Sequence, residues 1–140
     1  MKELLKAIRA ALRGEVAIVA LVPGGIYLDL AQTGASLPYL VWNHAGQFTT
    51  GFNTGDHQIE HHILRFRTFA PSIVTAADCF AEIEKLLVTT PPPALDAGTI
   101  MLILRESGMI ALDPDLSTEG EEVWVSTLQL AVTMQRNPIA

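Results

Sequence analysis

The 140-residue sequence has little positive charge and almost no cysteine. Lysine and arginine together number nine against fifteen aspartates and glutamates, which gives a formal net charge of −6. A protein that grips nucleic acid through its phosphates normally presents a basic surface, so the composition argues against that class. The single cysteine, Cys79, excludes an internal disulfide framework and a multi-cysteine zinc site, and we expect it to be a buried structural thiol.

The sequence also lacks a long apolar run. The longest extends over the seven residues from Val16 to Val22 and is ended by Pro23-Gly24-Gly25, whereas a membrane-spanning helix needs about 20 apolar residues. The N-terminal residues carry charge and show no apolar core of a signal peptide. We therefore expect a soluble intracellular protein, and the length predicts one domain over residues 1–140.

Recognisable catalytic motifs are missing as well. The chain has no G-x-S-x-G nucleophile elbow, no Walker-type glycine-rich loop that ends in lysine and no dinucleotide-binding fingerprint. A calcium loop that would begin at Asp113 fails, because its sixth and twelfth positions hold Thr118 and Trp124 instead of glycine and glutamate. These absences predict that the protein is not an enzyme and uses no cofactor.

One segment, Asp56 to His62, combines histidines with carboxylates, the usual ligands of a metal site. On a strand, His57 and His61 would share a face but lie about 13 Å apart, and His61 and His62 would point to opposite faces. We therefore interpret the segment as a strand with exposed histidines and expect no metal. A metal-binding protein that uses His57, His61 and His62 is kept as an alternative function.

Hydrophobic periodicity predicts an α+β fold. Helical spacing of apolar residues occurs in three segments: residues 2–13, 16–22 and 75–88. Strand patterns occur in five: residues 26–30, 39–44, 57–70, 99–112 (interrupted at Ser107-Gly108) and 123–134. After the N-terminal helical segments, the predicted strands follow one another and only one helix separates them. We therefore expect a small, mostly antiparallel sheet of four to five strands with two to three helices packed on one face.

The patterns also make finer predictions inside these elements. Apolar residues fall on both parities of the 57–70 strand, which predicts a strand covered on both faces or a bulge near His61 and His62. Thr75, with Asp78 three residues later, is expected to cap the third helix. The buried stripe of that helix is expected to contain Ile73, Ala77, Phe80, Ile83 and Leu87. One face of the 99–105 strand is expected to carry Ile100, Leu102 and Leu104.

Two segments are candidates for contact with a partner. Residues 47–56 are expected to form a long loop or hairpin tip, on which Phe48 and Phe52 would present apolar rings, as interfaces often do. The acidic excess of the chain gathers in a predicted turn region that contains Asp113, Asp115, Glu119, Glu121 and Glu122. This stretch is either a solvated hairpin loop or a negative rim that faces a partner or a passing polyanion.

Several stretches along the chain together form a recognisable layout. After the N-terminal helix come Val22-Pro23-Gly24-Gly25-Ile26-Tyr27, the segment from Ala31 to Trp42, the strand from His62 to Phe69, the helix with Ala76-Ala77-Asp78 and the strand from Trp124 to Val132. This layout resembles the tail completion or tail terminator proteins of long-tailed bacteriophages and prophages, over roughly residues 2 to 135. One departure is that Ala31-Gln32 lacks the proline that the family often has between them.

The resemblance implies a structural virion protein. Family members assemble into a ring, typically of six copies, at the head-proximal end of the tail tube, where the ring ends tube polymerisation and offers the surface for head–tail joining. It implies four partners: further copies of the chain, the tail tube protein, a head-completion or connector protein, and DNA that passes through the lumen without specific binding. It also implies a location in the neck of the virion after assembly in the host cytoplasm. Another neck or tail-tube component on the same fold is the main alternative.

The residues themselves are compatible with this role. A negative ring lumen would let DNA slide, because phosphate contacts are what hold DNA, and the acidic second half of the chain motivates that hypothesis. A ring also needs head-to-tail contacts, so each subunit must carry two different complementary patches. The edges of the sheet and the loop with Phe48 and Phe52 are the candidates for these patches.

Overall fold

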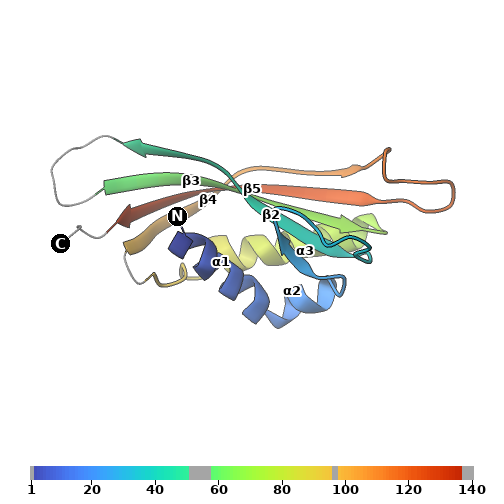
Figure 1. Ribbon diagram of the computed structural model, residues 1–140, viewed down its shortest axis with the longest axis horizontal. Coiled ribbons are helices and arrows are strands. Elements are labelled where there is room, and N and C mark those ends of the chain that lie inside the picture. The colour runs from blue at the N-terminus through green and yellow to red at the C-terminus, as the bar shows by residue number, and fades with distance from the viewer. Residues whose placement is uncertain (1, 51–57, 96–97, 137–140) are drawn as a thin grey trace.

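A five-stranded sheet with helices on one face forms the frame of the protein, as a computed structural model shows for residues 2–50, 58–95 and 98–136 (Figure 1). The helices in these ranges are α1 (Lys2–Gly14), α2 (Val16–Leu21) and α3 (Ile73–Glu84), and α3 continues into the π-helical segment η1 (Lys85–Thr89). The strands are β1 (Ile26–Leu28), β2 (Tyr39–Thr50), β3 (Gln58–Ala70), β4 (Gly98–Leu112) and β5 (Trp124–Arg136). The predicted α+β class is confirmed. None of the helices in the described ranges has the length and apolar character needed to cross a membrane.

The strands lie in the order β1-β2-β3-β5-β4. Only β1 and β2 are parallel, and the other neighbours are antiparallel. The register places one residue of every strand in a single row across the sheet: Ile26, Leu40, Thr68, Ser126 and Ile110. β4 therefore forms one edge of the sheet, and the short β1 with the rest of β2 forms the other.

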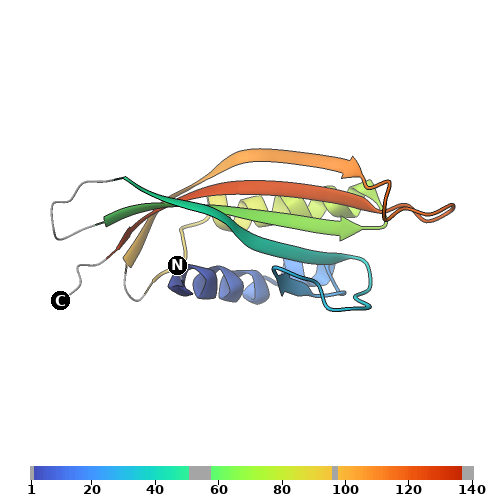
Figure 2. The ribbon, with the colours of Figure 1, turned by 45° about the horizontal axis from the view of Figure 1, so that its top comes forward.

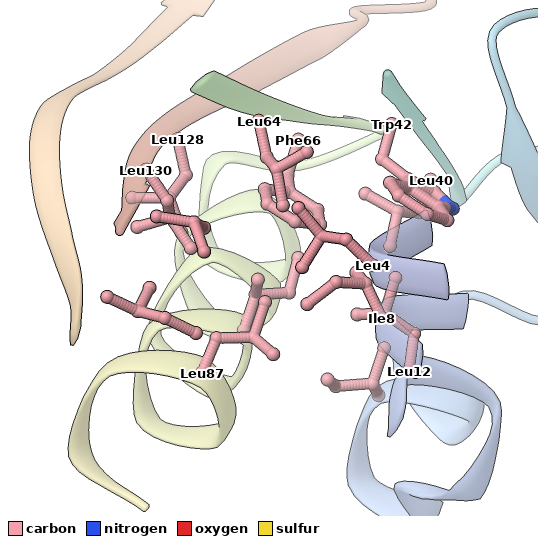
Figure 3. Close-up of a cluster of buried hydrophobic side chains, with 14 of the residues drawn as sticks. Leu4, Ile8, Leu12, Leu40, Trp42, Leu64, Phe66, Leu87, Leu128 and Leu130 are labelled. Carbon is pink, nitrogen blue, oxygen red and sulfur yellow. The ribbon is translucent and has the colours of Figure 1, made fainter. Parts of the chain in front are cut away.

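The hydrophobic core lies between the sheet and the helices (Figure 3). α1 contributes a stripe of fully buried residues that recur at helical spacing: Leu4, Ile8 and Leu12. From the sheet, the ring of Trp42 stacks on that of Phe66 at 5.9 Å. Cys79 of α3 is fully buried, as expected, and accepts a hydrogen bond from the Thr68 hydroxyl at 3.2 Å. Burial raises the pKa of the Cys79 thiol, so this cysteine is inert core rather than a nucleophile.

The alternation along β3 is stricter than the sequence suggested. Its even-numbered residues from Glu60 to Ala70 are buried beneath the helices, and the odd-numbered ones are half-buried on the other face. The bulge that the sequence offered as an alternative near His61 and His62 lies instead in the neighbouring strand β2, whose pairing with β3 shifts between His44 and Gly46. The expectation of exposed histidines was wrong for His62, which is 0% exposed, because it occupies an even position of β3.

β4 differs from its predicted pattern in two ways. Its pairing with β5 shifts between Ile100 and Leu102, so the buried residues are Ile100 and Ile103, while Leu102 and Leu104 are exposed on the other face. The strand also continues through Ser107-Gly108 instead of stopping there. Gly108 fits this strand because the Phe80 ring of α3 lies against it, at 2.4 Å from where a Cβ atom would stand.

Two further boundaries differ from prediction. α3 begins at Ile73 with Ser72 as its cap, and the Ser72 hydroxyl accepts the Thr75 amide at 3.2 Å. Thr75 is therefore the capped residue rather than the cap. Of the predicted stripe, Ile83 and Leu87 are buried as expected, Ala77 and Phe80 are half-buried and Ile73 is exposed, while Ala76 and Cys79 complete the buried face. β2 extends to Thr50, so residues 47–50 are strand rather than loop.

Candidate assembly surfaces

Exposed apolar side chains are spread along β4, which forms an edge of the sheet. Within the described residues β4 pairs only with β5, so the other side of its 15-residue backbone faces outward. Five of its large apolar side chains are exposed: Met101, Leu102, Leu104, Met109 and Leu112. Proteins normally blunt a free edge with charge, proline, β-bulges or a very short strand, because an open edge is a template for another strand. β4 has two shifts in pairing and the charged residues Arg105 and Glu106, yet these five apolar side chains stay exposed. The β4 edge has the character of a surface that another chain covers.

The opposite edge of the sheet is built differently. β1 is three residues long and pairs with Leu40, Val41 and Trp42 of β2. Beyond these three residues, no strand in the described ranges covers the outer side of β2. The molecule therefore presents two unlike edges, one long and apolar and one stepped, which is the arrangement that head-to-tail contacts between identical copies require.

The helix-free face of the sheet carries two arginines that are held by neighbours. The guanidinium of Arg65 donates to the Gln129 side-chain oxygen at 3.1 and 3.3 Å, and the Gln129 amide donates to Glu106 at 3.0 Å. The guanidinium of Arg67 lies 5.9 Å from the centre of the Phe69 ring. Since the Arg65–Gln129–Glu106 contacts crosslink β3, β5 and β4, Arg65 braces the sheet rather than standing free for phosphate groups, while Arg67 lies against a ring of its own strand.

Two of the five carboxylates in the predicted acidic turn accept hydrogen bonds from nearby residues of the chain. The Asp113 carboxylate accepts the amides of Asp115 and Leu116 at 2.9 and 3.2 Å and so fixes the turn. Glu122 accepts the indole N–H of Trp124 at 3.0 Å. The other three carboxylates are exposed, and no ion pair engages them among the residues that the structure describes: Asp115, Glu119 and Glu121. These three are the acidic groups available to a partner.

A groove that the sequence did not predict runs beside α1, α2 and β1. Two adjoining hollows, of about 420 and 250 Å³, share the lining residues Arg13, Ile26 and Tyr27. Arg9, Val19, Leu28 and Leu30 extend the lining. Leu30 is 82% exposed, and both arginines are exposed without an ion pair inside the described ranges. The groove thus combines an apolar lining with the positive charges of Arg9 and Arg13.

The histidine-rich strand holds a buried hydrogen-bonded chain in place of an open site. The His62 Nε2 lies 3.0 Å from a carboxylate oxygen of Glu60, and the His62 Nδ1 lies 2.8 Å from the Nε2 of His44. His61 points to the opposite face, where its Nδ1 lies 3.2 Å from the Thr133 hydroxyl. No group of three potential metal ligands gathers among the described residues, and His57 lies outside them. Within those ranges the alternative of a histidine metal site therefore has no geometric support.

The histidine pair predicts acid sensitivity. Burial lowers the pKa of both His44 and His62, and His62 lowers that of His44 further, although Glu60 partly opposes the shift at His62. Histidine in an unfolded chain titrates at about pH 6.5. Below that pH the unfolded chain therefore binds more protons than the native protein, in which both pKa values are lowered. The free energy of unfolding is therefore expected to be largest above about pH 6.5 and to decrease as the pH falls below that value. Urea unfolding at pH 7.5 and 5.5 measures this.

The variant His44→Gln, which removes one of the two shifted groups, should show a smaller loss of stability between pH 7.5 and 5.5 than the unmodified chain. His61→Gln is the matched control, since His61 lies on β3 beside His62 but points to the opposite face of the sheet, away from the histidine pair. A pH dependence that His44→Gln leaves unchanged would assign the acid sensitivity to other groups.

The phenylalanines proposed for an interface lie mostly beyond what the structure describes. The backbone of Phe48 belongs to β2 and pairs with His61, but its side chain is outside the described part. Phe52 falls in the range 51–57, which is also outside. Their role at an interface therefore stays a prediction.

Comparisons with known proteins extend these observations. The model of a family described as "Tail completion protein gp17" matches residues 6–130. A chain from the virion of a native gene transfer agent particle aligns with a TM-score of 0.67, 15% identity and 92% coverage of both chains. The bacteriophage SPP1 gp17 protein aligns with a TM-score of 0.53, 16% identity, and coverage of 92% of this chain and 88% of its own. No curated protein matches by sequence. The two structural alignments show a shared fold.

Proposed function

The chain belongs to the tail completion protein gp17 family, and we propose that it closes the head-proximal end of a phage tail tube as a ring. Membership makes it a structural component of phage tails rather than an enzyme, as the sequence predicted. The proposal adds that identical copies, typically six, join side by side, end the polymerisation of the tube and form the surface for head–tail joining. The neck of the virion is its proposed place, reached after assembly in the host cytoplasm.

The observation that carries the proposal is the pair of unlike sheet edges. β4 runs antiparallel to β2, because β5 and β3 lie between them with alternating direction. Copies that stand side by side with the same orientation would therefore bring the β4 edge of one next to the β1–β2 edge of the next as antiparallel neighbours. Such contact would cover the exposed side chains of Leu104 and Met109 and satisfy edge backbone groups.

The proposed partners follow from the same arrangement. The two ends of the ring would contact the tail tube protein on one side and a head-completion or connector protein on the other. Phe48, Phe52 and the acidic residues 113–122 are the proposed partner-facing residues. DNA is proposed to pass through the lumen without specific binding, which agrees with the net charge of −6 and with Arg65, whose guanidinium is held within the sheet.

The proposal is tested by native mass and by capping of tubes. Light scattering over a concentration series is expected to show a ring near six subunits, alone or after addition of tail tubes. Electron microscopy of tubes assembled with and without the protein is expected to show a ring at one end and a halt in further growth. Tubes that keep growing and carry no added density at either end, together with a monomer at every concentration, would refute the proposal.

A further inference from the structure

The turn between β4 and β5 projects from one end of the sheet at the β4 edge, and α2 and β1 lie near the same end at the opposite edge (Figure 2). The acidic turn begins three residues after Ile110 of β4, and the groove beside α1 and α2 is lined by Ile26 of β1. Ile110 and Ile26 occupy the two ends of the one row that crosses all five strands. A side-by-side array of equally oriented copies that keeps this row in line from copy to copy would therefore set the turn of one copy next to the groove of the next.

The two features also match in chemistry. The turn offers the exposed carboxylates of Asp115, Glu119 and Glu121 around Leu116, an apolar side chain that is 48% exposed. The groove offers the exposed guanidinium groups of Arg9 and Arg13 around an apolar lining that includes Val19 and Leu30. Arginine matches the planar carboxylate through paired hydrogen bonds, and an apolar anchor ringed by charge pairs is typical of an interface.

We infer that in the ring the acidic turn of one subunit docks into the groove between α1, α2 and β1 of its neighbour, with Leu116 as the apolar anchor. The inference rests on the proposed ring and names its second contact, beside the pairing of the sheet edges. The occupant is a second copy of this chain, because the turn follows directly from the β4 edge that faces that copy. In this arrangement the three carboxylates face the neighbouring subunit rather than passing DNA.

Cross-linking between cysteines tests the contact directly. The chain holds one native cysteine, Cys79, which is buried and gives little background. The double variant Leu116→Cys/Val19→Cys, treated with a short bismaleimide in the assembled state, is expected to give a ladder of linked subunits. Leu116→Cys/Val74→Cys is the matched control, because Val74 is an exposed apolar residue at the start of α3, outside the groove. Equal ladders from the two pairs, or no ladder from the first, would overturn the inference.

Charge reversal tests the pairing by a second route. Arg9→Glu/Arg13→Glu and Glu119→Lys/Glu121→Lys are each expected to weaken ring formation at least tenfold, and combining both pairs in one chain is expected to restore most of it. The weakening should shrink at high salt, since salt screens exposed charges. Arg9→Gln/Arg13→Gln serves as a milder variant where glutamates would disturb α1.

Each outcome of the charge reversal has one meaning. Turn variants that assemble like the unmodified chain would overturn the docking and return the turn to solvent or the lumen. Restoration by the combined variant would support it. Unmodified protein that forms no ring even on tubes would instead refute the proposed function, so the two failures are distinguishable.

Discussion

Leu104→Lys combined with Met109→Lys is expected to abolish ring formation while leaving the subunit folded. Both side chains lie on β4 and are exposed, at 51% and 63%, so their replacement removes little buried apolar area from the core. The cost to the free energy of unfolding should therefore stay within about 0.5 kcal/mol for each position. In the ring, by contrast, each lysine would stand at the boundary with the next copy, and charge on an edge strand is how proteins prevent strand addition. Light scattering and a tube-capping assay measure the loss.

The control for this prediction is Val74→Lys, which places the same charge on another exposed apolar residue, at the start of α3. Its expected effect on assembly is nil, and its effect on stability is a few tenths of a kcal/mol to about 1 kcal/mol because lysine is unfavourable near a helix N-terminus. Rings that form normally from the β4 double variant would show that this edge is not the subunit contact. Loss of assembly together with loss of the unfolding transition would point to misfolding instead.

Element type and order could be predicted from the sequence because they depend on local periodicity. The spacing of Leu5, Ile8 and Leu12 predicts α1, and the alternation from Leu128 to Val132 predicts β5, and both were confirmed. The order of strands around a single later helix then predicted an antiparallel sheet. These features need no knowledge of what each residue contacts.

Features that depend on a single inserted residue could not be predicted. In β4 the shift in pairing beyond Ile100 moves Leu102 and Leu104 from the expected buried face to the exposed one, since one extra residue reverses the alternation until a second shift, between Arg105 and Ser107, reverses it again. Without the first shift, Leu102 and Leu104 would not belong to the exposed apolar side chains of this edge. The burial of His62 could not be predicted for a different reason, because histidine is as compatible with a buried hydrogen-bonded position as with an exposed one.

The candidate interface was predictable only in part. The sequence identified the acidic stretch, but it could not show that Asp113 and Glu122 are occupied within the turn while Asp115, Glu119 and Glu121 are not. The groove was invisible, because Arg9 and Arg13 on α1 approach β1 only through the tertiary fold. The charge complementarity that we propose across a subunit boundary therefore rests on the register of the sheet rather than on any motif.

Gly24→Ala is expected to destabilise the protein by about 3 kcal/mol or more, at the upper end of what overpacking costs. The backbone explains why: a Cβ atom at Gly24 would stand 1.7 Å from the carbonyl oxygen of Ser36 and 2.6 Å from that of Pro38. The Gly24 amide also donates to the Pro38 carbonyl at 2.9 Å, and its own carbonyl accepts the Tyr27 hydroxyl at 2.6 Å. The two chain segments can therefore not separate without breaking the bonds that hold them beside β1.

Gly14→Ala is the matched control, since nothing lies within 4 Å of a Cβ atom at that position and it falls at the end of α1. It is expected to leave stability unchanged or to raise it by about 0.4–1 kcal/mol through the reduced freedom of the unfolded chain. Urea unfolding of both variants measures the contrast, and equal midpoints would show that the backbone around Gly24 yields easily. Because Gly24 holds the segment that leads into Ile26 and Tyr27, a folded but loosened Gly24→Ala protein should also dock its neighbour poorly. Its rings should then require higher protein concentration even where the β4 edge is intact.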